Sequence, residues 1–127
     1  MRRLSRRDRR GGDERGSASI LLAGVMGVMV LLSGAAMVVA GYVVAYHRVR
    51  AAADLAAVSA AAAFEQGGDA CSQARRSAAD NGARVVQCDQ VGDQIGYVVS
   101  VCAEMTVASR IRGLPTTVQA WAHAGSA

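Results

Sequence analysis

Three cysteines are the residues whose type and spacing suggest chemistry most directly. Cys71, Cys88 and Cys102 all lie in the C-terminal part of the chain, and no two of them form a CxxC pair. A bridge between Cys71 and Cys88 would close a loop of about 17 residues and stabilise the fold by roughly 3 kcal/mol in the chain-entropy model. A bridge between Cys88 and Cys102 is the alternative, and three reduced, buried thiols are a third possibility. The role of Cys102 stays open.

The remaining polar residues form no catalytic pattern. His47 and His123 are far apart in sequence, and no GxSxG, P-loop or HExxH motif occurs. No histidine stands at zinc-ligand spacing from a cysteine. We therefore expect no enzyme activity, no cofactor and no metal. Asp54, the one acid within an alanine-rich stretch, is interpreted as a candidate contact to a partner.

The positive charge of the chain is concentrated at its N-terminus. Residues 1–16 carry seven Arg against three acids, whereas residues 47–127 carry seven of each, so the net charge of +4 lies in the first segment. A nucleic-acid-binding domain would spread basic residues over a folded face and add aromatic side chains. Only 4% of the residues are aromatic, and we expect no nucleic-acid partner.

A long uncharged segment follows this basic leader. No charged side chain occurs in residues 17–46, and about 20 helical residues suffice to cross a bilayer. We predict a transmembrane helix here, because a chain of 127 residues is too small to cover such a helix with its own core. The arginines before it place the N-terminus in the cytoplasm and the C-terminus outside the cell membrane.

Residues 47–127 are predicted to form a small extracytoplasmic α+β domain. The helix continues through residues 47–66 until Gly67 and Gly68 end it, and a second short helix covers residues 70–80. Alternating apolar residues then predict strands at 84–91, 95–106 and 116–124. The expected fold is a long N-terminal transmembrane helix that extends outward, a second helix and a pilin-like, three-stranded antiparallel sheet packed against the outer part of the long helix.

Three glycines recur every seven residues in the apolar segment, at Gly27, Gly34 and Gly41. Small residues on one face allow helices to approach closely in lipid. The stripe is therefore a candidate packing face for partner helices, and the alternative is a chance alignment in a segment rich in Gly and Ala.

Three features together resemble a known family. They are the basic leader that ends in Arg15 and Gly16, the long uncharged helix, and an alanine-rich block after it. The block contains the most specific residues, Ala53, Asp54, Leu55, Ala56 and Ala57. Over about residues 13–63 the chain resembles the TadE/TadG-like (tight adherence, Flp-type) pilus-assembly proteins, and it is most similar to short actinobacterial TadE-like proteins encoded near secretion genes. Cys71 and Cys88 also look like the paired cysteines of that subgroup.

The resemblance implies a structural function. Such proteins are minor pseudopilins or anchored components of a Tad/Flp-type pilus or a type II-like secretion apparatus, and their helices contact other pilin-like or Tad components. A prepilin peptidase cuts related pseudopilins after a glycine at the junction of leader and helix, which corresponds to Gly16 followed by Ser17. Pilins of this kind carry a Glu five residues into the mature chain, and this sequence has Leu21 there.

Two other functions are compatible with the same sequence. The first is an uncleaved bitopic adaptor that keeps its leader and whose outer domain binds another secretion component. The second is a small secreted protein released by signal peptidase, with a mature start near Gly41.

Overall fold

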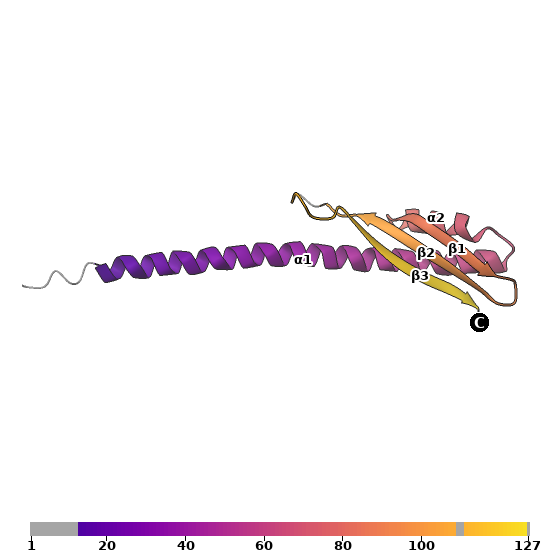
Figure 1. Ribbon diagram of the computed structural model, residues 1–127, viewed down its shortest axis with the longest axis horizontal. Helices are drawn as coiled ribbons and strands as arrows, with labels where there is room; N and C mark the ends of the chain where they lie inside the picture. The colour runs from indigo at the N-terminus through magenta and orange to yellow at the C-terminus, as the bar shows by residue number, and fades with distance from the viewer. Residues whose placement is uncertain (1–12, 109–110, 127) are drawn as a thin grey trace, which may run out of the picture. The chain divides into compact units, whose positions relative to one another are not determined.

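The fold is α+β, as predicted. A computed structural model describes residues 13–108 and 111–126, with the side chains of residues 13–15 left out. In chain order the elements are α1 (Asp13–Glu65), α2 (Ala70–Asp80), β1 (Arg84–Gly92), β2 (Tyr97–Thr106) and β3 (Thr117–Ser126), as labelled in Figure 1. The predicted leader, residues 1–16, lies for the most part outside the described residues.

The chain divides into two units, Met1–Val39 and Ala40–Ala127. The described part of the first unit is the N-terminal part of α1. The second unit contains the remainder of α1, all of α2 and the sheet, and it therefore holds the whole of the folded core.

α1 ends at Glu65, just before the glycine pair, as the sequence predicts. Gly67 has a φ of 79°, a left-handed conformation that costs glycine little. Its N–H donates to Phe64 O at 2.9 Å, and the N–H of Gly68 donates to Ala63 O at 2.8 Å. These bonds satisfy carbonyl groups that the helix end would otherwise leave without partners. Asp69 then caps α2, accepting a hydrogen bond from the N–H of Ser72.

The three strands form one antiparallel sheet in the order β1-β2-β3. The turn between β1 and β2 uses Gly92, with a φ of 105°, where a Cβ atom would clash with the carbonyl oxygen of Gly96. Asp93 Oδ1 accepts hydrogen bonds from the N–H groups of Ile95 and Gly96, and these bonds lower the pKa of its carboxyl.

Four strand ends differ from the sequence prediction, and two of them, the start of β2 and the end of β3, differ by two residues. β2 begins at Tyr97 rather than at residue 95, because the Asp93 carboxylate holds the N–H of Ile95 in the turn. Ile95 consequently lies 87% exposed instead of facing the core. β3 extends beyond residue 124 to Ser126, since Gly125 and Ser126 still pair with Val98 and Tyr97 of β2.

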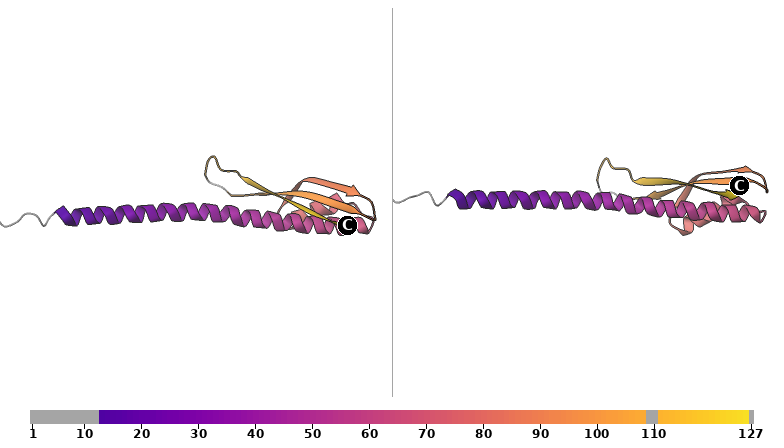
Figure 2. Two further views of the ribbon diagram at one scale, coloured as in Figure 1. Left: turned by 60° about the horizontal axis from the view of Figure 1, so that its bottom comes forward. Right: turned by 90° about the horizontal axis from the view of Figure 1, so that it is seen from below.

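Alanine and valine fill the core of the second unit. The sheet lies along the C-terminal part of α1 (Figures 1 and 2), and its inner face contributes Tyr97, Val99, Val101 and Ala103 from β2. Small side chains let the helix backbone approach the sheet, so a core can form without many bulky residues. The alanines of α1 and α2 in this core are Ala52, Ala53, Ala56, Ala57, Ala60, Ala61, Ala70, Ala74 and Ala78.

Candidate functional site

The apolar surface of α1 is the largest candidate for an interaction site. Among the described residues, α1 is the one helix long and apolar enough to cross a membrane, and none of its most apolar window is buried within the chain. The core helix of a soluble protein would be mostly covered. Large side chains such as Ile20, Leu31 and Met37 are each about three-quarters exposed, and an exposed apolar surface of this kind is typical of a site that contacts a membrane or a partner.

The glycine stripe also lies open. At Gly27, Gly34 and Gly41 no atom lies within 4 Å of the place where a Cβ atom would stand. Each position thus has room for a neighbouring helix, and none is used for packing within the described chain. Association through this face remains a prediction.

The predicted cleavage junction lies within α1. Gly16 and Ser17 are helical, because α1 begins at Asp13. Gly16 has open space around its Cα. The first turns of a helix have backbone N–H groups without intrahelical partners and fray most easily. A peptidase would need to unwind only this end of α1 to reach the peptide bond.

The alanine-rich block divides between two faces of α1. Ala53, Ala56 and Ala57 are buried in the core that α1 shares with α2 and the sheet, so their small side chains let these elements approach closely. Asp54 and Leu55 point away from the core and are exposed. With Val58, which is also exposed, they form an outward strip on which an external partner could bind.

Of the pairings that the sequence leaves open, the structure contains Cys71–Cys88. The bridge joins α2 to β1 across a sequence separation of 17. It holds α2 against the sheet. The buried residues of α2 are all alanines, so α2 has few large apolar contacts of its own.

Cys102 is a free, buried thiol. It alternates with Val101 and Ala103, which face the core, so it stands on the outer face of the sheet. It is nevertheless only 2% exposed, with Gln87 and Trp121 as its partners on the neighbouring strands. Burial, and secondarily the Glu104 carboxylate, raises the pKa of this thiol, which disfavours the reactive thiolate.

Two sets of hydrogen bonds within the second unit could not be predicted from the sequence patterns. Tyr97 Oη donates to Glu65 Oε1 at 2.8 Å and lies 3.2 Å from Ala61 O, and the hydrogen bond to the carboxylate raises the pKa of the phenol. Tyr42 Oη donates to the carbonyl oxygen of Pro115. The first contact ties β2 to the end of α1, and the second ties Pro115, just before β3, to the C-terminal part of the apolar segment.

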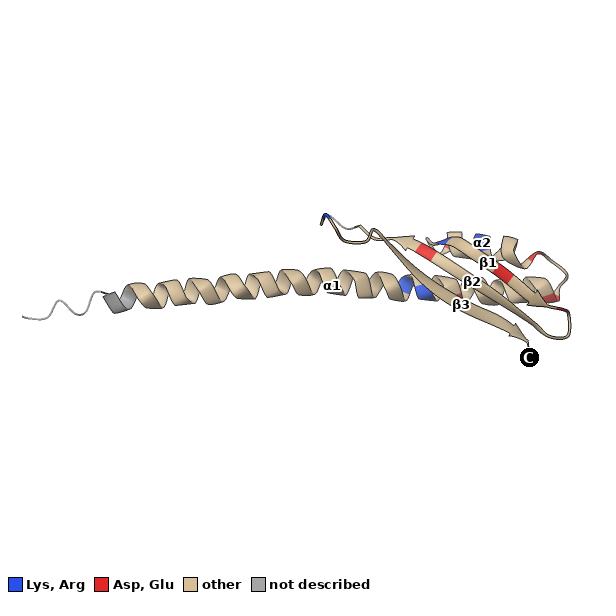
Figure 3. Ribbon diagram, in the orientation of Figure 1, with Lys and Arg blue, Asp and Glu red and all other residues tan. Residues whose placement is uncertain are grey.

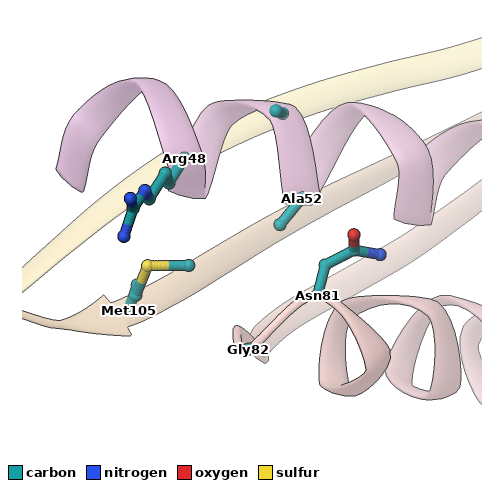
Figure 4. Close-up of a pocket in the computed structure, with 6 residues that line it drawn as sticks. Arg48, Ala52, Asn81, Gly82 and Met105 are labelled. Carbon is teal, nitrogen blue, oxygen red and sulfur yellow. The ribbon is translucent and has the colours of Figure 1, made fainter. Parts of the chain in front are cut away.

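A cavity of about 380 Å³ lies between α1, the end of α2 and the end of β2. In Figure 4 the Arg48 side chain reaches toward Met105, while Asn81 lies nearer Ala52. The amide Nδ2 of Asn81 donates to Ser77 O. The lining offers one cation and one amide but no paired acid and base, so it provides no catalytic arrangement. The lining residues are Arg48, Ala51, Ala52, Asn81, Gly82 and Met105.

Among residues 13–108 and 111–126, no group of three His, Cys, Asp or Glu side chains is placed to hold a metal ion. No protein-family model, curated protein or solved structure matches this chain. A functional assignment must therefore be argued from the residues and the geometry described above.

Proposed function

We propose that this protein is a membrane-anchored structural component of a Tad/Flp-type pilus or type II-like secretion apparatus, comparable to a TadE-like minor pseudopilin. One observation carries the proposal. A single helix, α1, has an exposed apolar N-terminal part and an alanine-rich C-terminal part that supports a small antiparallel sheet. The first part suits lipid or the apolar interior of a helical assembly, and the second carries a domain that can be displayed in water.

The orientation we propose follows from charge. Seven arginines precede the apolar segment, and only Arg48 and Arg50 follow it closely. Basic residues are retained on the cytoplasmic side, so the second unit would stand outside the cell membrane. The disulfide between Cys71 and Cys88 supports this orientation, since disulfides persist in oxidising compartments.

Removal of the leader would convert an anchored protein into an assembly subunit. Each arginine near an anionic leaflet contributes about 1 kcal/mol of attraction. Cleavage after Gly16 would remove all seven arginines of the leader. The remaining helix would then be held by apolar contacts alone, which neighbouring helices can replace.

The N-terminus of the native, membrane-extracted protein tests this proposal. Mass spectrometry should find Ser17 as the first residue. The variant Gly16→Leu should retain the leader, whereas Gly24→Leu, a matched change at an equally open helical glycine, should be processed normally. A mature start near Gly41, with protein in the medium, would show instead a secreted protein released by signal peptidase.

An uncleaved adaptor is the second candidate, and Leu21 favours it. Pilins that assemble in register use a Glu at that position of the mature helix, and here an apolar side chain is exposed in its place. In that case the leader persists and the helix contacts a partner through its glycine stripe. Gly34→Leu should then reduce crosslinking in detergent, while Ala36→Leu, two residues further round the helix, should not. Equal crosslinking of both variants and the parent would remove the helix-packing claim.

A further inference from the structure

We propose that residues 111–116, which lead into β3, rest on the outer surface of the lipid bilayer, with Ile111 among the lipid headgroups and Arg112 and Arg48 facing their phosphates. The inference rests on the proposed function in one respect, that α1 crosses a bilayer. It adds a second membrane contact, made by the folded domain itself.

A hydrogen bond fixes the depth of this connection. Tyr42 Oη donates to the carbonyl oxygen of Pro115, and both residues belong to the second unit. The N–H of Val107 donates to Thr116 O at 2.7 Å, which closes the connection at the end of the β2–β3 ladder. Pro115 therefore lies beside α1 at the level of Tyr42, wherever along the membrane normal that residue stands.

The length of α1 places Tyr42 at the outer boundary of the hydrocarbon. Twenty-two residue steps separate Ile20, the first large apolar residue of the uncharged segment, from Tyr42, and they span about 33 Å of helix at 1.5 Å per residue. The hydrocarbon core of a bilayer is about 30 Å thick. Tyr42 and Tyr46 are the aromatic residues of this segment, and tyrosine is enriched at the interface between membrane and water.

Arg48 then falls at headgroup depth. It follows Tyr42 by six residues, or about 9 Å along the helix. The headgroup region adds roughly 5–7 Å on each side of the hydrocarbon, and the arginine side chain is long enough to reach back into it. Because Arg48 also lines the cavity in Figure 4, a phosphate could approach it from the solvent side.

The described residues of the connection have the chemistry of an interfacial contact. Ile111 is 51% exposed, Arg112 is exposed, and Leu114 is half-buried. An exposed branched apolar side chain next to an arginine suits the boundary between acyl chains and phosphates. The left-handed Gly113, with a φ of 95°, turns the chain back toward Pro115.

The charges of the second unit are arranged in agreement with this orientation. Figure 3 shows basic residues on α1, on α2 and at the turn before β3, and acidic residues on β1 and β2 as well as at the opposite end of the unit. Arg48 and Arg50 lie in α1 ahead of Asp54, Arg112 lies just before β3, and Arg84 and Glu104 are paired positions of β1 and β2. Glu104 is already paired with Arg84. Glu65 ends α1, Asp69 caps α2, and Asp93 lies in the turn between β1 and β2. An anionic lipid surface would attract Arg48, Arg50 and Arg112.

A lipid surface explains these features better than a protein partner does. Any chain that crosses the bilayer with Tyr42 at its boundary has Pro115 at the same level. Lipid therefore surrounds the chain at this level at all times, and a protein partner could bind there only by displacing lipid.

Depth-dependent fluorescence quenching in vesicles tests the proposal on the full-length chain. Single cysteines are introduced at Ile111 or at Ile95 in a Cys102→Ala background and labelled with the same maleimide fluorophore, which leaves the Cys71–Cys88 bridge intact. Ile95 is the matched control, an exposed isoleucine in the turn at the acidic end. The protein is reconstituted into phosphatidylcholine vesicles with and without phosphatidylglycerol, containing spin-labelled lipids as quenchers.

We expect the label at residue 111 to be quenched several-fold more strongly than the label at residue 95. Phosphatidylglycerol should increase the difference, and Arg112→Gln should reduce it. Flotation of the vesicles is measured first. Protein that floats and resists carbonate, with equal quenching at both positions, overturns the loop contact while leaving the membrane helix in place. Protein that does not float overturns both proposals together.

Discussion

Substitution of Ala56 by leucine tests whether the alanine-rich block exists to bring α1 close to the sheet. Ala56 is fully buried, as are its neighbours along the same face, Ala53 and Ala60. Leucine adds three carbon atoms at a fully buried position in the core of the second unit. Both residues are good helix formers, so intrinsic helix propensity changes little, and any loss of stability reports on packing.

The expected cost follows from overpacking. Inserting methylene groups into a well-packed core typically costs 1–3 kcal/mol, so Ala56→Leu should lower the free energy of unfolding by about 2 kcal/mol. Ala52 provides a graded comparison, because it is 2% exposed but lines the cavity of about 380 Å³. Ala52→Leu has space to enter and should cost less. Ala62 is exposed on the same helix, and Ala62→Leu should stay within about 0.5 kcal/mol of the parent.

Trp121 supplies the assay. It is the single tryptophan of the chain and lies in β3, so its emission reports on the second unit even when the apolar part of α1 is held in a detergent micelle. In guanidinium titrations the parent and Ala62→Leu should have the highest midpoints. Ala52→Leu should have a lower midpoint, and Ala56→Leu the lowest. Equal midpoints for Ala56→Leu and Ala62→Leu would refute the close packing of helix and sheet.

Two further predictions use the same titration. Replacing Cys71 and Cys88 together by serine should lower the free energy of unfolding by about 3 kcal/mol, because the unfolded chain regains the freedom of a loop of 17 residues; dithiothreitol should reproduce the loss in the parent and have no effect on the variant. Hydrogen bonds from Gln119 and Arg84 lower the pKa of Glu104 below its ordinary value of 4.5, so its contribution is present above that value and is lost as the pH falls through the lowered pKa. Glu104→Gln should therefore flatten the acid limb of the stability curve, and an unchanged limb would contradict this assignment.

Sequence patterns predicted the elements because each has a local cause. Gly67 and Gly68 end α1, and Asp69 caps α2. Alternation of apolar residues in residues 97–103 predicts the inner face of β2, which Val99 and Val101 occupy. The three-stranded antiparallel sheet could be anticipated from the turn chemistry at residues 92–93 and the break at residue 115.

Contacts between elements could not be predicted in this way. The alanine block is nearly uniform in sequence, so nothing local distinguishes buried Ala56 from exposed Ala62. That choice depends on which face of α1 the sheet covers. The bonds of Tyr97 to Glu65 and of Tyr42 to Pro115 join residues 32 and 73 apart, and only the assembled second unit brings them together. Nor does any local pattern give the β2–β3 connection its place beside α1.

The position of Cys102 links the fold to the choice of disulfide. Strand alternation alone would leave this thiol exposed on the outer face and able to compete for Cys88. In the structure the neighbouring strands place Trp121 and Gln87 on either side of it, and it is 2% exposed. Thiol–disulfide exchange requires access and a thiolate, and burial, with the Glu104 carboxylate, raises the pKa of this group. Once the sheet has formed, Cys102 is withdrawn from exchange, so Cys71 and Cys88 can remain joined in an oxidising compartment without a competing thiol from their own chain.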